Sequence, residues 1–251
     1  MNSQIKRIQI FGERCSGTSF LNHLVAENLK SVRLCKDFGW KHGFHEAGVE
    51  VARDCLFIVI YRNPFDWLRS LHRRPHHVGP TLKKRSFSEF IRTEWWCIWD
   101  EDASKTPADE LYGAEMMAER NPETGERFAD VIDLRTAKIR DWESLRDKVA
   151  HSVYVRYEDL AASPSQFIDS LTRRFGLPKP PTFTPIERKR GKRGQYHPKV
   201  YKRIRASDLR HIVGRLDAEL ESSIGYDVAT LAADPDLQIP RVLRKLRNLW
   251  K

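Results

Sequence analysis

The segment of residues 12–19, GERCSGTS, constrains the fold of this chain more than any other part. It lies between residues 5–11 (IKRIQIF), which are rich in isoleucine, and residues 19–29 (SFLNHLVAENL), whose apolar residues recur at helical spacing. This order predicts a strand, a glycine-containing loop and a helix. The glycines have the spacing of a Walker A loop, but Thr18 stands where that loop carries lysine. The segment therefore predicts an anion-binding loop without the usual lysine of nucleoside triphosphatases.

Such a loop binds anions because its backbone N–H groups and the positive end of the following helix converge on one point. The hydroxyls of Thr18 and Ser19 add donors, and Arg14 can add the missing positive charge. The alternative is an ordinary tight turn before a helix. The residues that we expect to bind a phosphate here are Gly12, Arg14, Cys15, Ser16, Gly17, Thr18 and Ser19.

A second strand-to-helix turn follows residues 55–61 (CLFIVIY), a continuous apolar run typical of a central parallel strand covered on both faces. Arg62 stands at the end of this strand, and Ser70 lies in a helix that begins near Pro64. Ligands of open α/β folds bind at the carboxyl ends of the strands, so Arg62 and Ser70 can reach one anion there. The alternative is a solvated arginine and a serine on a helix surface.

Two strand-to-helix turns in one chain predict a parallel sheet with crossover helices. We expect an α/β fold of three layers, a central parallel sheet with helices on both faces, in a single domain spanning residues 1–251. Further strands are expected over residues 31–35 and 151–156, and further helices over residues 87–99, 130–149 and 164–175. The tryptophans of residues 94–100 stand at helical spacing and are expected in the core.

The chain carries a formal net charge of +10, which points toward anionic partners. Residues 188–205 are strongly basic and contain no acidic residue, and within them Lys189, Arg190 and Gly191 are expected to contact a phosphate. A solvated basic face and nucleic-acid binding are the alternatives. Residues 239–250 are basic and amphipathic, and we expect a helix packed on the domain, with weak contact to a membrane surface as the alternative.

The first residues contain no apolar segment of the length of a signal peptide or a membrane span, so a cytoplasmic location is expected. The four cysteines are widely spaced and form no CxxC pair. This spacing predicts reduced thiols and neither a disulfide framework nor a metal site.

Taken in order, these loops resemble the motifs of the sulfotransferase family that uses 3′-phosphoadenosine 5′-phosphosulfate (PAPS). Residues 15–19 (CSGTS) resemble the K-S-G-T-T loop for the 5′-phosphosulfate, and residues 62–70 (RNPFDWLRS) match the R-x-P-x-D-x-x-x-S pattern for the 3′-phosphate. Residues 189–194 look like the R-K-G-x-x-G loop, and residues 156–160 (RYEDL) look like a structural turn of the family. Residues 12–18 (GERCSGT), with residues 40–43 (WKHG) downstream, look like a bacterial-type branch. The resemblance implies the P-loop-like sulfotransferase fold and PAPS as co-substrate, with no metal. It also implies a small-molecule or glycan acceptor and no nucleic-acid partner.

The resemblance also implies catalytic residues, with one departure. The lysine of the K-S-G-T-T loop is Cys15 here, so the group that steadies the leaving oxygen is expected to be Arg14 first and Lys41 second. A catalytic base in related enzymes follows the second strand, where His42 stands, and the ordinary pKa of histidine suits that role. A purely structural His42 is the alternative.

The sequence is compatible with two other functions. A P-loop nucleotide kinase or triphosphatase is disfavoured by Thr18 and by the absence of an aspartate at the end of residues 55–61. A non-catalytic protein of the same fold that binds a nucleotide or a polyanion is the other alternative.

Overall fold

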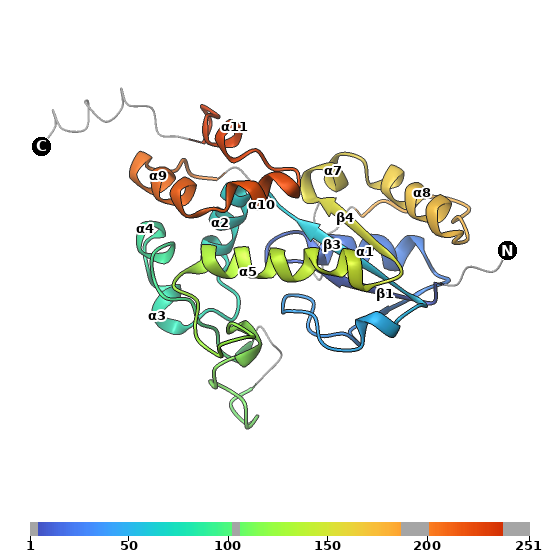
Figure 1. The fold of residues 1–251 in the computed structure, drawn as a ribbon, viewed down its shortest axis with the longest axis horizontal. Coiled ribbons are helices and arrows are strands. Elements are labelled where there is room, and N and C mark those ends of the chain that lie inside the picture. The colour runs from blue at the N-terminus through green and yellow to red at the C-terminus, as the bar shows by residue number, and fades with distance from the viewer. Residues whose placement is uncertain (1–4, 102–105, 187–200, 238–251) are drawn as a thin grey trace, which may run out of the picture.

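The computed structural model describes residues 5–101, 106–186 and 201–237. At its centre lies a four-stranded sheet in the order β2-β1-β3-β4, and all neighbouring strands are parallel (Figure 1). The strands are β1 Arg7–Phe11, β2 Arg33–Cys35, β3 Cys55–Tyr61 and β4 Ser152–Arg156. Every residue of β3 is buried, as its uninterrupted apolar sequence predicts for a central strand.

Helices connect the strands and follow them. They are α1 Thr18–Asn28, α2 Pro64–Arg73, α3 Pro80–Lys83, α4 Phe87–Phe90, α5 Val131–Glu143, α6 Leu145–Lys148, α7 Tyr157–Ala162, α8 Pro164–Phe175, α9 Ala206–Arg215, α10 Ala218–Ser223 and α11 Val228–Ala232. Among the described residues, the longer connections contain the short 3₁₀ turns η1 Val49–Val51 and η3 Met117–Glu119.

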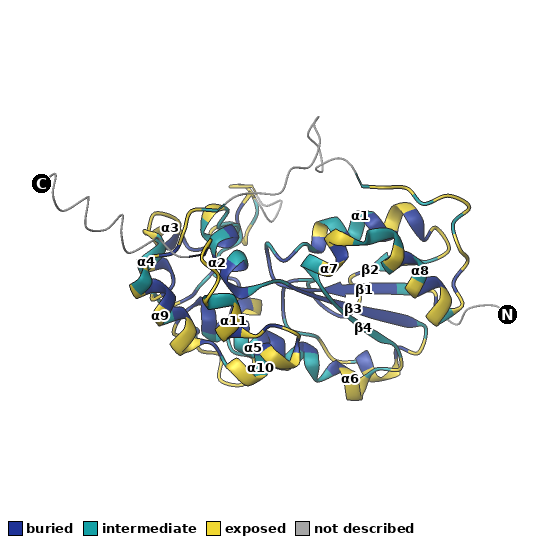
Figure 2. Ribbon diagram, turned by 90° about the horizontal axis from the view of Figure 1, so that it is seen from above, coloured by how far each residue is buried: buried dark blue, intermediate teal, exposed yellow. Residues whose placement is uncertain are grey.

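Both faces of the sheet are covered by helices (Figure 2). On one face, Leu21 of α1 and Leu171 of α8 pack in the same cluster as Ile58 of β3. On the other face, Trp142 of α5 packs in a cluster with Val59 of β3. The predicted three-layer α/β arrangement is therefore confirmed.

A third core cluster lies beyond the carboxyl edge of the sheet. It joins Trp67 of α2, Phe90 of α4 and Leu209 of α9 with the buried Trp95. Figures 1 and 2 both place α2, α3, α4 and α9 together at this end of the molecule. The phosphate-binding motifs of the sequence fall at the junction between this helical part and the sheet.

The expected helix over residues 87–99 is wrong in its second half. The helix α4 ends at Phe90, and isolated antiparallel bridges then join Trp95 to Phe128 and Cys97 to Val78. Burial alternates along this stretch, since Trp95 and Cys97 are buried while the residue after each is half-buried. Alternation with a period of two is the mark of an extended chain. The prediction that the tryptophans of this stretch enter the core is nevertheless correct for Trp95, while Trp96 and Trp99 are half-buried against the same cluster.

The other predicted elements are present with small shifts. The expected helix over residues 130–149 is two helices, α5 and α6, separated at Ser144. The helix over residues 164–175 matches α8. The basic residues 188–200 and the amphipathic residues 239–250 lie outside the described residues.

Candidate anion-binding site

The loop between β1 and α1 turns tightly at two glycines. Gly17 has φ +102°, and a Cβ atom there would lie 2.4 Å from Cδ2 of Tyr157. A Cβ atom on Gly12 would lie 2.6 Å from the carbonyl oxygen of Ile60. The close approach of β3 and α7 to the loop therefore requires glycine at both positions.

Four successive carbonyl groups of this loop accept hydrogen bonds from side chains. The pairs are Gly12 O with His42 Nδ1 (2.6 Å), Glu13 O with Ser16 Oγ (2.6 Å), Arg14 O with Trp67 Nε1 (2.9 Å) and Cys15 O with an Arg62 guanidinium nitrogen (2.8 Å). These bonds occupy the acceptors of the loop. The first N–H groups of α1, at Thr18, Ser19 and Phe20, have no acceptor within the helix. Together with the helix dipole they provide the donors of an anion site.

Arg14 points away from this site and into the helical core. Its guanidinium forms an ion pair with Glu119 (2.6 Å), and it also donates to the carbonyl of His76 (2.9 Å). Glu119 pairs in addition with Lys138 (2.5 Å). Burial acts to raise the pKa of Glu119, but Arg14 and Lys138 outweigh it and the pKa is lowered. The charge of Arg14 is thus balanced inside the core, where it supports the loop from behind.

Cys15 lies in the loop with a left-handed backbone, at φ +65°, and is half-buried. Burial raises the pKa of its thiol, although a hydrogen bond with Ser70 opposes the shift. The thiol is therefore protonated at neutral pH and is a weak nucleophile. The contact with Ser70 brings the first and the second predicted phosphate motifs together.

Arg62 extends from the end of β3 to the same loop. One terminal nitrogen donates to the carbonyl of Cys15 (2.8 Å) and the other to the hydroxyl of Tyr201 (3.1 Å), while the guanidinium stacks 4.7 Å from the ring centre of Tyr157. Its Nε is buried, and no group of the described residues accepts a hydrogen bond from it. No carboxylate of the described residues forms an ion pair with this cation. A partly buried positive charge with an unused N–H donor is the arrangement expected of a side chain that binds an anion.

The turn after Arg62 is held in place by local capping. The side chain of Asn63 accepts from the backbone N–H groups of Phe65 (2.9 Å) and Asp66 (3.4 Å), and Pro64 occupies the first helical position. These are the residues that a helix start favours. The backbone N–H of Asn63 donates to Glu158 (3.1 Å) at the start of α7.

His42 lies against the start of the loop. Because the Gly12 carbonyl can only accept, Nδ1 of His42 must carry the hydrogen, which leaves the lone pair on Nε2. No described residue bonds to Nε2. Burial lowers the pKa of His42 well below its usual range, so the ring is neutral at pH 7. The carbonyl of Lys41 accepts from Gly12 N (3.0 Å), so the chain at Lys41 and His42 runs beside the loop.

Arg135 of α5 is a site residue that the sequence motifs did not indicate. It is 0% exposed and donates to Glu13 Oε2 (2.8 Å), to the Arg62 carbonyl (3.0 Å) and to both carboxylate oxygens of Glu221 (2.5 and 2.8 Å). The sequence feature that could have indicated Arg135 is its position on the same apolar helix face as Ile139, four residues later. A charge on an apolar helix face needs a buried partner.

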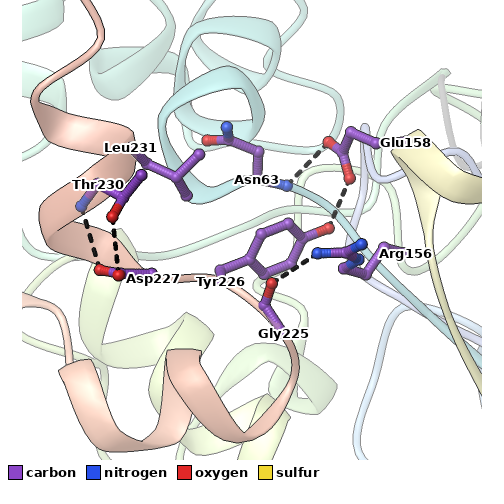
Figure 3. Close-up of a pocket in the computed structure, with 8 residues that line it drawn as sticks. All are labelled: Asn63, Arg156, Glu158, Gly225, Tyr226, Asp227, Thr230 and Leu231. Carbon is purple, nitrogen blue, oxygen red and sulfur yellow. Dashed lines mark hydrogen bonds between the residues drawn. The ribbon is translucent and has the colours of Figure 1, made fainter.

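A cavity of about 240 Å³ lies near the ends of β3 and β4, beside the link between α10 and α11 (Figure 3). Its polar groups bond to one another, since Glu158 accepts from Tyr226 Oη (2.6 Å) and Arg156 donates to the Gly225 carbonyl (2.7 Å). No residue of the 12–19 loop lines this cavity. Asn63, which follows Arg62, does line it, so the cavity is separate from the 12–19 loop but borders the second turn.

Of the predicted site residues, the structure brings the 12–19 loop, Lys41, His42, Arg62 and Ser70 to one place. The predicted contacts Lys189, Arg190 and Gly191 lie outside the described residues. Within residues 5–101, 106–186 and 201–237, no group of three or more His, Cys, Asp or Glu side chains is arranged to hold a metal ion. In the same ranges no helix has the length and apolar character needed to cross a membrane.

No protein-family model matches this chain, and no curated protein matches it in sequence. Among solved structures, the chain is similar to the crystal structure of mouse sulfotransferase SULT7A1 complexed with PAP. The two are 12% identical with a TM-score of 0.40, over 96% of this chain and 76% of the mouse chain. A likeness this distant does not by itself indicate a shared activity.

Proposed function

We propose that this protein transfers a sulfuryl group from PAPS to a hydroxyl acceptor. The observation that carries the proposal is the bond between Arg62 and the carbonyl of Cys15, which joins two anion-binding turns at one edge of the sheet. A ligand with phosphate groups at both its 5′ and 3′ positions matches two adjacent anion sites. An ordinary nucleoside triphosphate needs only the first.

In this proposal, different residues bind the 5′-phosphosulfate and the 3′-phosphate of PAPS. The 5′-phosphosulfate would be held by the loop from Gly12 to Ser19, whose donors are the first N–H groups of α1. The 3′-phosphate would be held by Arg62, with its spare Nε, and by Ser70. Lys189, Arg190 and Gly191 remain our prediction for a third contact.

The reaction requires one proton acceptor and stabilisation of one leaving group. The acceptor oxygen forms a bond to sulfur as the bond from sulfur to the phosphate oxygen breaks, and the hydroxyl proton passes to Nε2 of His42. The loop N–H groups stabilise the negative charge that develops on the departing phosphate oxygen. Lys41 is the cation that we propose for that oxygen, because its backbone pairs with Gly12 at the start of the loop, whereas the side chain of Arg14 turns into the helical core. We propose a small-molecule or glycan hydroxyl as the acceptor.

Calorimetric titration with 3′-phosphoadenosine 5′-phosphate, AMP and ATP tests this proposal. We expect the bisphosphate to bind most tightly, and Arg62→Ala to weaken its binding by about 10- to 100-fold, the value of one or two charge-assisted hydrogen bonds. Arg156→Ala is the matched control, because Arg156 stands at the end of the neighbouring strand but is paired with Asp159 (2.7 Å).

Equal binding of all three nucleotides, or no binding of any, would overturn the proposal. Mg²⁺-dependent turnover of ATP would favour the nucleotide kinase alternative instead.

A further inference from the structure

One fully buried guanidinium connects the two anion-binding turns. Arg135 donates to the carboxylate of Glu13 in the first turn (2.8 Å) and to the backbone carbonyl of Arg62 in the second (3.0 Å). Glu221 of α10 fixes the other side of the same group through two bonds. The planar fork of an arginine holds its partners at set distances and angles.

The sheet alone does not hold these two turns together. The register between β1 and β3 ends at the pair Phe11 and Val59, so Glu13 and Arg62 both lie beyond the last paired residues. Beyond the ends of the paired strands, Arg135 of a third element, α5, bonds to both segments. The bond of Arg62 to Cys15 comes from a side chain, whereas Arg135 fixes the backbone position from which that side chain extends.

We propose that Arg135 is a positioning residue that sets the separation of the two anion-binding turns and thereby gives the site its preference for a ligand with two phosphate groups. This inference rests on the proposed function, because it assigns one phosphate to each turn. Arg135 itself does not contact the ligand.

A purely structural role for Arg135 makes a different prediction, and the same helix supplies the control. Lys138 lies three residues further along α5, is 1% exposed, and forms a buried ion pair with Glu119 (2.5 Å). Glu119 also pairs with Arg14 of the first turn, so Lys138 is linked to that turn through Glu119, but no bond of Lys138 connects the first turn to the second. Lys138→Met therefore removes a buried charge of similar type behind the first turn without removing a bond between the two turns.

The experiment compares the wild-type chain with Arg135→Gln, Arg135→Lys and Lys138→Met. For each, calorimetry gives the ratio of affinities for 3′-phosphoadenosine 5′-phosphate and AMP, and thermal unfolding gives stability. We expect both Arg135 variants to lower the ratio by at least about tenfold, because small displacements of binding groups have large effects. Lys138→Met should lose stability and keep the ratio. Arg135→Lys keeps the charge and serves if Arg135→Gln does not fold.

An unchanged ratio in Arg135→Lys would overturn the inference, as would an equal fall of the ratio in Lys138→Met. A wild-type chain with no preference for the bisphosphate would be recognised separately. In that case the proposed function fails, and this inference fails with it.

Discussion

Replacement of Gly17 by alanine should destabilise the fold by about 3 kcal/mol. The residue has φ +102°, and a side chain in left-handed backbone costs roughly 1–2 kcal/mol. The new methyl group would lie 2.4 Å from the ring of Tyr157, and an overpacked site of this kind adds roughly 1–3 kcal/mol. The smaller entropy of the unfolded alanine chain offsets about 0.5 kcal/mol of this loss.

Urea denaturation of Gly17→Ala measures the total, and two further variants separate its parts. Gly176→Ala has the same kind of backbone, at φ +61°, but open space around the added atom, so it should lose only about 1 kcal/mol. In a Tyr157→Ala background the ring is absent, and Gly17→Ala should then cost about as little as Gly176→Ala. The reasoning is refuted if Gly17→Ala and Gly176→Ala cost the same in the wild-type background.

Three further predictions concern buried charged and titratable groups. Burial raises the pKa of Glu13 to about 7, against the attraction of Arg135. The unfolded chain therefore loses this proton first, and stability should fall by roughly 3 kcal/mol between about pH 4.5 and about pH 7, then level off. Glu13→Gln should lack that fall in denaturation curves across this range, and identical pH dependence in both proteins would contradict the assignment. His42→Gln should slow sulfuryl transfer by about 10²–10⁴-fold and remove an acid limb lying below pH 6.5 in the pH–rate profile; an unchanged limb would exclude His42 as the base. Arg14→Leu should cost about 3–5 kcal/mol of unfolding free energy, because Glu119 loses a buried partner, and a loss below about 1 kcal/mol would show that Lys138 alone satisfies it.

The sequence predicts the sheet well because its strands have distinct signals. The apolar run of residues 55–61 is long enough for only one buried strand, and the glycine loop after β1 marks the start of α1. The stretch around Trp95 is wrongly predicted because large apolar residues at positions 95, 96 and 99 fit helical spacing as well as an extended chain. Its bridge partners, Phe128 and Val78, are too far away in the sequence to be anticipated.

The site is predicted less completely than the sheet, because motifs name residues without giving the directions of their side chains. Arg14 belongs to the loop, yet its side chain turns to Glu119, a residue 105 positions away. Arg135 lies in no motif, and its role depends on two turns that meet only in the folded chain. By contrast, Arg62 and Ser70 reach the loop as their spacing at a strand end predicts.

The bonds of Arg135 also bear on the order in which the chain folds. They join residues separated by 122, 73 and 86 positions, so three distant segments must meet before the guanidinium is satisfied. Contacts of such long range close large loops and form slowly. We expect the two turns to acquire their final spacing only after α5 and α10 have docked. A ligand that requires that spacing would then bind the completed fold and not the partly folded states. Its binding would therefore lower the population of intermediates in which α5 or α10 has detached.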